Sequence, residues 1–250
     1  MIGFSLLTLG SFAQKGTLND PEVYRIRMGV SNPWLIKGEK TVLIDAGIPN
    51  KFDSFKRQLS KLPVAPSDIR LIVLTHCHFD HIGLANEIRE LTGAKIAIHE
   101  SDRALLEEGR FIIPEGTSAW GKFARKVFMP LMKKLGRDMQ PIKADIVLTN
   151  NPFPLEEYGI AGRIIPTPGH TLGSVSVILD NGDAFVGCMA QNRLPFTLHP
   201  QLPIFADHME LFRDSWSYLA NQGAKRIFPG HGGSFPIRRM HRTWEKVSSR

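Results

Sequence analysis

The sequence contains few cysteines and no long apolar run. Only Cys77 and Cys188 occur among 250 residues, and two cysteines do not make the disulfide framework of a small secreted domain. No apolar stretch approaches the ~20 residues that a membrane-spanning helix needs. Hydrophobic residues make up 42% and charged residues 22% of the chain, which is ordinary for a globular protein. The low number of cysteines excludes a disulfide scaffold, and the lack of a long apolar run excludes a helical membrane span.

Acidic residues are the minority charge, and the excess of positive charge is concentrated in one segment. The chain has 31 Lys and Arg against 24 Asp and Glu, a formal net charge of +7. Residues 110–143 alone contain eight basic residues against two acidic ones. Such a segment attracts anionic substrates, acidic lipid or nucleic acid, or else it forms an ordinary solvated helix face.

The first residues differ from the rest of the chain. They read MIGFSLLTLGSFAQKG, which resembles the apolar centre of a signal peptide with a small residue at Ala13, but without a basic start. Residues 1–20 are therefore either a signal-peptide remnant on an exported, periplasmic protein or a disordered tail on a cytoplasmic one. No low-complexity linker divides residues 21–250, so we expect these residues to form a single domain.

Short apolar runs bounded by turn residues predict strands in both halves of the chain. The predicted strands lie at 23–29, 32–38, 41–47, 71–75, 95–99, 162–167, 174–180, 183–187 and 225–229. Helical spacing predicts helices at 51–62, 84–91, 101–109 and 207–222. We expect Ser101 to be the N-cap of the third helix. Two strand-rich halves, each followed by helices, predict one α/β domain of two sheets covered by helices.

The segment 109–143 is basic, apolar and rich in proline. Its apolar residues recur every four positions at Phe123, Val127, Leu131 and Leu135. This spacing predicts an apolar helical face, with a bend at Pro130. As a lid, the segment could line a substrate pocket and hold an anionic group with its Lys and Arg residues. The pocket candidates are Phe111, Ile113, Trp120, Phe123 and Phe128. Alternatively, the apolar face only packs on the body and the charges lie in water.

Metal chemistry is indicated by the string HCHFDH, which follows the predicted strand at 71–75. It places three histidines and an aspartate within six residues: His76, His78, Asp80 and His81. Imidazole nitrogens and carboxylate oxygens are ligands that zinc accepts. A loop at a strand end can turn these side chains together, so the string favours a metal site over isolated structural histidines.

Four short motifs in a fixed order give the chain its resemblance to a known family. They are THCHFDH at 75–81, PGHT at 168–171, GC at 187–188 and PGHG at 229–232, and TVLIDAG at 41–47 adds an early strand with an aspartate. Over about residues 22–235 the sequence resembles the metallo-β-lactamase fold superfamily, in particular its lactonase-like and glyoxalase II-like members. The resemblance implies a four-layer αββα sandwich with a metal site at one edge of the sheets.

The resemblance also implies two zinc ions and assigns their ligands. The first zinc would be held by His76, His78 and His170, and the second by Asp80, His81 and His231. Asp45 resembles a residue that orients a ligand; the alternative is a turn residue with a solvated side chain. We expect the Pro-Gly pairs of PGHT and PGHG to force the turns that present their histidines.

Cys188 departs from the usual pattern of the family, in which most hydrolases carry an aspartate that bridges the metals. One subgroup of β-lactamases has a cysteine there, but it lacks a histidine equivalent to His81 and has a lysine where this chain has Gln191. A thiolate favours zinc over magnesium or manganese. Cys188 either bridges two zincs, binds one, leaves the second site weak, or is only a small buried hydrophobe. We expect Cys77 to point into the core.

This resemblance implies a hydrolase that uses a zinc-bound hydroxide on an ester, lactone or thioester of amphiphilic or acyl-bearing character. Asp80 would be a ligand that also orients the hydroxide. Two alternatives stay open: a β-lactamase-like amide hydrolase, and a non-catalytic binding or sensor protein with an impaired second metal site. We expect a small-molecule partner rather than nucleic acid, because the aromatic-basic interleaving typical of nucleic-acid binding is missing. A membrane surface is indicated only by the basic segment.

Overall fold

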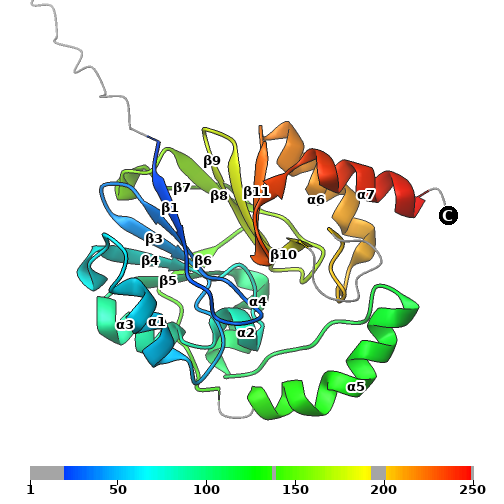
Figure 1. The fold of residues 1–250 in the computed structure, drawn as a ribbon, viewed down its shortest axis with the longest axis horizontal. Helices are drawn as coiled ribbons and strands as arrows, with labels where there is room; N and C mark the ends of the chain where they lie inside the picture. Colours follow the sequence, from blue (N-terminus) through cyan, green and yellow to red (C-terminus); the bar gives the residue numbers. More distant parts are fainter. Residues whose placement is uncertain (1–19, 137–138, 193–200, 249–250) are drawn as a thin grey trace, which may run out of the picture.

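Two six-stranded sheets form the centre of the molecule (Figure 1). The computed structural model describes residues 20–136, 139–192 and 201–248, so the prediction for residues 1–20 lies, except for Asp20, outside the described residues. The first sheet has the order β1-β2-β3-β4-β5-β6, with β1 Glu22–Arg25, β2 Trp34–Lys37, β3 Thr41–Ile44, β4 Ile69–Val73, β5 Lys95–His99 and β6 Ile146–Leu148. The second has the order β12-β11-β10-β9-β8-β7, with β7 Phe153–Pro154, β8 Gly162–Pro166, β9 Val175–Leu179, β10 Asp183–Gln191, β11 Arg226–His231 and β12 Phe235–Pro236.

Parallel pairing gathers the strand ends of each sheet at one edge. From β3 to β6 the neighbouring strands of the first sheet are parallel, and β10 and β11 are parallel in the second. The remaining pairs are antiparallel. Because parallel neighbours end at the same edge, the residues that follow β3, β4 and β5 come close together.

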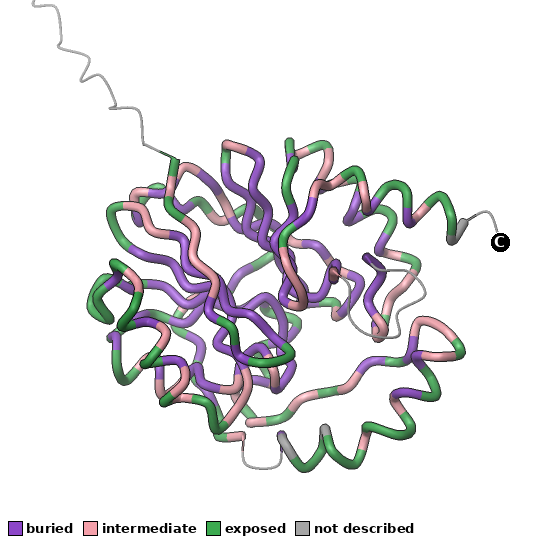
Figure 2. The backbone as a smooth tube through the Cα atoms, viewed as in Figure 1, coloured by how far each residue is buried: buried purple, intermediate pink, exposed green. Residues whose placement is uncertain are grey.

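Three apolar clusters divide the molecule into four layers. The first lies between the first sheet and helices α1 Phe52–Leu59, α3 Ala85–Thr92 and α4 Glu100–Glu107. The second fills the space between the two sheets. The third lies between the second sheet and helices α6 Met209–Asn221 and α7 Arg238–Ser248. The order helix, sheet, sheet, helix confirms the predicted sandwich, and Figure 2 shows the buried residues concentrated in the sheets.

The strands alternate between these layers because successive side chains of a strand point to opposite faces. In β3, Val42 and Ile44 face the other sheet while Leu43 faces the helices. In β10, Phe185 faces the first sheet and Val186 faces α6 and α7. Each buried strand therefore contributes to two cores at once.

An aromatic cluster joins the two sheets. Phe185 stacks on Phe228 with ring centroids 4.6 Å apart, and Trp34 meets Phe228 edge-on at 5.0 Å. The indole Nε1 of Trp34 donates a hydrogen bond to the carbonyl oxygen of Pro229 at 3.0 Å. This bond ties β2 of the first sheet to β11 of the second, so the two sheets are held in a fixed relation.

Most predicted helices and strands are present, with ends displaced by a few residues. The predicted N-cap of α4 is wrong: the helix begins at Glu100, and the N-cap His99 accepts a hydrogen bond from the backbone N–H of Ser101 through Nδ1 at 3.2 Å. The strand predicted to end at Gly187 continues to Gln191. The sequence analysis did not predict β6, α7 or the short helix α2 Phe79–Ile82.

The basic segment forms helix α5 Ala119–Leu135, which runs through Pro130. In Figure 1 this helix lies beyond the sheets, at the end of a long extended connection from α4. Its predicted apolar face is present but does not pack on the body, since Phe123, Val127 and Leu131 are exposed. None of the described helices is long and apolar enough to span a bilayer.

Candidate metal centre

The predicted site residues meet at the edge where strands of both sheets end. The first sheet contributes residues from the loop after β4 and from α2: His76, His78, Asp80 and His81. The second sheet contributes residues from the loop between β8 and β9, from β10 and from the end of β11: His170, Cys188 and His231. Their potential ligand atoms form three groups, in each of which the atoms lie within 4.8 Å of one another: His76, His78 and His170; His76, His81 and Cys188; Asp80, His81 and His231. The groups share members and form one cluster.

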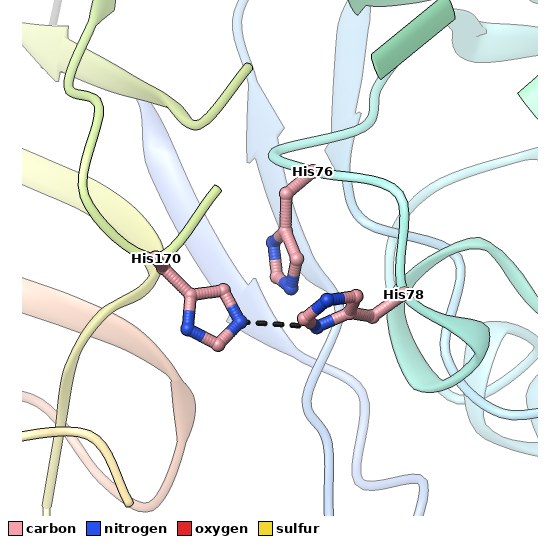
Figure 3. Close-up of side chains that lie close together, drawn as sticks. All are labelled: His76, His78 and His170. Atoms are coloured by element: carbon pink, nitrogen blue, oxygen red, sulfur yellow. Dashed lines mark hydrogen bonds between the residues drawn. The ribbon is translucent and has the colours of Figure 1, made fainter. Parts of the chain in front are cut away.

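Three histidine rings converge in the first group (Figure 3). Nε2 of His170 lies 3.0 Å from Nδ1 of His78, and Nδ1 of His170 donates a hydrogen bond to the carbonyl oxygen of Phe205 at 2.8 Å. The Nε2 atoms of His76 and His78 are buried and have no hydrogen-bond partner among the described residues. Because an unpartnered buried polar atom is costly, these nitrogens fit a metal ion, for which imidazole is a natural ligand.

Burial keeps the imidazoles of His76 and His78 neutral. Desolvation lowers the pKa of His76 to about 4, and the positive charge of His81 adds to the effect. Desolvation likewise holds the pKa of His78 well below its ordinary value, helped by His76 and His170. Neutral imidazole is the form that binds a metal, so both side chains are in the ligand form at neutral pH.

Cys188 lies between the first group and the second. Its Sγ is 3.2 Å from Nε2 of His81, and it shares a group with His76. Nε2 of His81 is also 3.3 Å from Nε2 of His231, and Oδ2 of Asp80 lies 3.6 and 3.5 Å from these two nitrogens. The thiol therefore contacts members of both predicted ligand sets and does not lie at an outer corner of the cluster.

Charge coupling sets the protonation of the second group. Burial by itself would lower the pKa of His231 and of His81. The Cys188 thiolate and the Asp80 carboxylate outweigh this effect at both residues, and at His81 the Asp45 carboxylate raises the pKa as well. The pKa of His231 rises to about 9 and that of His81 rises well above its ordinary value. Burial would raise the pKa of Cys188, but the same histidines hold that pKa well below the value of a free thiol. Metal binding would therefore displace protons from the imidazoles of this group.

Asp45 fixes the orientation of His81. Its Oδ2 lies 2.7 Å from Nδ1 of His81, which leaves Nε2 directed at the cluster. Its Oδ1 accepts hydrogen bonds from the backbone N–H and the hydroxyl of Thr75 at 2.8 and 2.9 Å. The Asp45 backbone is left-handed, with φ 61°, which is uncommon for a residue other than glycine. A buried, fully bonded carboxylate is not the solvated turn residue of the alternative interpretation.

Two glycines of the sequence motifs make room for the cluster. A Cβ on Gly187 would lie 2.2 Å from Oγ1 of Thr75, and a Cβ on Gly230 would lie 2.5 Å from Cε1 of His81. The expected role of the Pro-Gly pair in PGHG is wrong, because this pair lies within β11 rather than in a turn before His231. Gly230 is needed there for space.

The other cysteine lies outside the cluster. Cys77 is buried in the core between the first sheet and its helices, as expected. Burial raises the pKa of its thiol, and the nearby Asp102 carboxylate acts in the same direction. Cys77 belongs to none of the ligand groups formed by the described residues.

Asp102 is a buried residue that the sequence analysis missed. Its Oδ2 accepts hydrogen bonds from the backbone N–H of Cys77 at 2.8 Å and from the hydroxyl of Thr171 at 3.0 Å. The carboxylate also accepts a bond from the backbone N–H of Gly173. Cys77 lies within the first histidine loop and Thr171 directly follows the histidine of the second, so Asp102 joins the two loops. In the sequence it looks like an ordinary acidic residue of a first helical turn.

A cavity of about 390 Å³ lies over the cluster. Five cluster residues form part of its wall: His78, Asp80, His170, Cys188 and His231. Apart from Gln191, the rest of the described wall is apolar. It comes from α5, the connection before it and the segment 203–205, together with Val30 and Phe79. The side-chain amide of Gln191 donates a hydrogen bond to the carbonyl oxygen of Leu202 at 2.6 Å. The cavity therefore offers an apolar surface directly in front of the candidate metal ligands.

The five predicted pocket residues do not all lie at this cavity. Three of the five predicted residues line this cavity: Ile113, Trp120 and Phe128. Phe111 packs against the ring of Phe79 at 5.5 Å and lines a separate cavity, while Phe123 is exposed. No Lys or Arg is among the described residues of the wall, so the expected basic anchor for an anionic group is not found there. Helical spacing identified the apolar positions but not which of them face the cavity.

Comparison with known proteins identifies the family. The model of the family described as the metallo-beta-lactamase superfamily matches residues 26–231. A probable metallo-hydrolase of Methanocaldococcus jannaschii is 32% identical over 151 residues, which are 60% of this chain and 63% of that protein, less than two thirds of its length. A metallo-beta-lactamase fold-containing protein of Sulfurisphaera tokodaii is 31% identical over 207 residues, which are 82% of this chain and 73% of that protein.

Solved structures share the fold. An archaeal metallo-beta-lactamase superfamily protein from Sulfolobus tokodaii superposes with a TM-score of 0.65 at 25% identity, over 91% of this chain and 86% of that one. A subclass B3 metallo-beta-lactamase of Bradyrhizobium japonicum gives a TM-score of 0.59 at 22% identity, over 92% and 82%. These solved structures share the αββα sandwich of this chain. The family match shows that the chain belongs to the metallo-beta-lactamase superfamily.

Replacing Asp102 should weaken metal binding. Asp102→Ala leaves the Cys77 N–H and the Thr171 hydroxyl without their acceptor, which should cost about 1–3 kcal/mol of stability and reduce zinc affinity about tenfold or more by loosening the loops. Zinc competition with a chromophoric chelator measures the affinity. The matched control is Asp68→Ala, which removes an exposed carboxylate that accepts the Ala65 N–H at 2.8 Å. Unchanged zinc affinity in folded Asp102→Ala would contradict the joining role.

Acid should destabilise the metal-free protein through His76 and His78, whose pKa values are lowered by burial. His76 binds a proton near pH 6.5 when unfolded but only near pH 4 when folded. Between these values the unfolded state binds more protons, so the free energy of unfolding falls as the pH drops from 6.5 to 4, by up to about 3 kcal/mol for this residue. Urea unfolding at pH 7 and pH 5 measures the loss. His76→Gln should show a smaller loss, and an equal loss would refute the assignment.

Proposed function

We propose that the protein is a zinc-dependent hydrolase that cleaves an ester, lactone or thioester carrying an apolar acyl part. The observation that carries this proposal is the position of the histidine, aspartate and cysteine cluster in the wall of an otherwise apolar cavity. The cluster supplies ligands for the metal, and the wall supplies a surface for the acyl part.

The donor set fits two zinc ions. His76, His78 and His170 would hold one ion, and Asp80, His81 and His231 would hold the other. Cys188 lies against both sets, which supports a bridging thiolate over a thiolate bound to one ion. Imidazole and thiolate together suit zinc better than the harder magnesium or manganese ions, which prefer oxygen.

Contacts on Nδ1 orient three of the histidines so that Nε2 of each ring faces the centre of the cluster. Asp45 contacts Nδ1 of His81, the Phe205 carbonyl accepts from His170, and the Val30 carbonyl accepts from Nδ1 of His231 at 2.7 Å. In each case Nε2 is left for the metal, an arrangement that fixes both the ring orientation and the tautomer. Zinc bound there would supply a Lewis acid that lowers the pKa of water and polarises a carbonyl group.

Other residues of the cavity wall bind and orient the substrate. Trp120 and Phe128 present aromatic faces from α5, and Ile113 presents an aliphatic one. These side chains bind the acyl part and exclude water from the cluster. Asp80 lies at the cavity wall beside the two histidines of the second group, where its carboxylate can accept a proton from the attacking water.

The absence of a described cation from the cavity wall disfavours a lactam carboxylate as the group recognised. Gln191 occupies the position at which a lysine would be expected in a cysteine-containing β-lactamase, and its amide is engaged with the backbone. An uncharged acyl ester, lactone or thioester needs no such cation. The apolar wall therefore supports the acyl substrate over the amide alternative.

A turnover screen tests the proposed function. The zinc-loaded protein should hydrolyse esters, lactones or thioesters with a rate that rises with acyl chain length, because longer chains bury more apolar surface. A cephalosporin and a phosphodiester serve as competing substrates, and Asp80→Ala serves as the inactive control. Turnover of the cephalosporin alone would favour the amide hydrolase. Two bound zincs without any turnover would favour the binding or sensor protein and refute the proposal.

Substitution of Cys188 tests its position between the zinc sites. Cys188→Ser should reduce the zinc content below two per chain, because a neutral hydroxyl replaces a thiolate. Cys188→Asp should retain the metal and hydrolytic activity, because it restores a bridging anion. Elemental analysis of metal per chain gives the readout, and Cys77→Ser is the matched control. Full zinc content in Cys188→Ser would show that the thiol is not a ligand.

A further inference from the structure

Helix α5 has apolar residues that face the cavity and others that are exposed on the outside of the molecule. Trp120, Ala124 and Phe128 line the cavity over the cluster. A second stripe with the same four-residue spacing lies beside them on the helix and is exposed: Phe123, Val127 and Leu131 have 57%, 51% and 53% of their surface accessible. Residues four apart lie above one another on one face of a helix, so this stripe is continuous along the helix.

The charged residues of α5 are all basic. Helix α5 contains no acidic residue, and its four lysines are exposed: Lys122, Lys126, Lys133 and Lys134. Lys122, Lys126 and Lys133 lie on the side of the helix away from the stripe, and Lys134 lies at the end of the stripe. An apolar face bordered by lysines is typical of a helix that lies in the plane of a membrane interface. The helix also lies outside the sandwich (Figure 1), where a planar surface can reach it.

We propose that α5 docks the protein on the surface of an anionic lipid bilayer. The docking stripe, defined as Phe123, Val127 and Leu131, enters the headgroup region, and the lysines contact acidic headgroups. Charge complementarity selects this occupant over a second copy of the chain, because segment 110–143 carries eight basic against two acidic residues. Two such segments facing each other would repel.

Docking would explain why the cavity wall and the exposed stripe lie on one helix. The residues facing the cavity and those facing outward form one apolar sector around α5. Ile112, on the connection before α5, is 51% exposed, and Val30, in the cavity wall, is 59% exposed, so apolar surface reaches the outside near the cavity as well. An acyl chain that leaves the bilayer could therefore stay in contact with apolar side chains until it reaches the metal-ligand cluster. This last step rests on the proposed function, whereas docking itself does not.

Vesicle binding tests the proposal with the zinc-loaded full chain. The protein should sediment with vesicles of phosphatidylcholine mixed with phosphatidylglycerol, and much less with phosphatidylcholine alone. Added salt should weaken the binding because it screens the lysines. The triple variant Phe123→Ser, Val127→Ser, Leu131→Ser should bind about tenfold or more weakly. Lys122→Gln with Lys126→Gln should lose the preference for anionic vesicles.

The matched control is Leu91→Ser with Val147→Ser, which removes two apolar side chains of 37% and 38% exposure outside α5. This control should bind vesicles like the unchanged protein. Equal binding by the triple variant and the unchanged protein would overturn the proposal. So would a dimer in solution that the triple variant dissociates, together with no vesicle binding by the unchanged protein. Hydrolysis of a water-soluble short-chain ester, measured on the same samples, reports separately on the proposed function, because the docking stripe does not line the cavity.

Discussion

The structure depends on the burial of a polar cluster at the edge shared by two sheets. Buried imidazole nitrogens without protein partners are unfavourable, and the fold accepts them because a metal can supply the missing bond. The surrounding residues serve this arrangement. Asp45 has a left-handed backbone conformation and contacts His81. At Gly187 the missing side chain leaves space for Thr75. Asp102 joins the two loops that carry His76, His78 and His170.

Much of this arrangement could be predicted because it is local in the sequence. Alternation in runs such as TVLIDAG sets the faces of the strands, and HCHFDH concentrates its polar residues directly after a buried strand. The role of Asp102 could not be predicted, because its partners Cys77 and Thr171 lie 25 and 69 residues away in the sequence. An acidic residue in the first turn of a helix is also common without any such role. Helical spacing likewise found the apolar residues of α5, but spacing does not tell whether Phe123 faces a cavity or solvent. The N-cap at His99 was missed because a histidine ring replaced the usual hydroxyl.

Cys188 gives the cluster a different chemistry from the aspartate that the family resemblance implies at this position. The thiolate keeps the negative charge between the two groups of ligands but makes it softer and larger than a carboxylate. Its charge also holds protons on His81 and His231 while the metal is absent. In the metal-free cluster the thiolate and these two histidines therefore carry opposite charges, which lowers the cost of burying them together.

Each sheet is built from one uninterrupted half of the chain, residues 22–148 for the first and 153–236 for the second. Neither half contains the whole cluster, since the first three histidines already come from both. During synthesis the first sheet can therefore form before the second exists, and the centre is completed only when the two halves meet. The connectivity therefore makes the complete cluster a property of the two docked halves and of neither half alone.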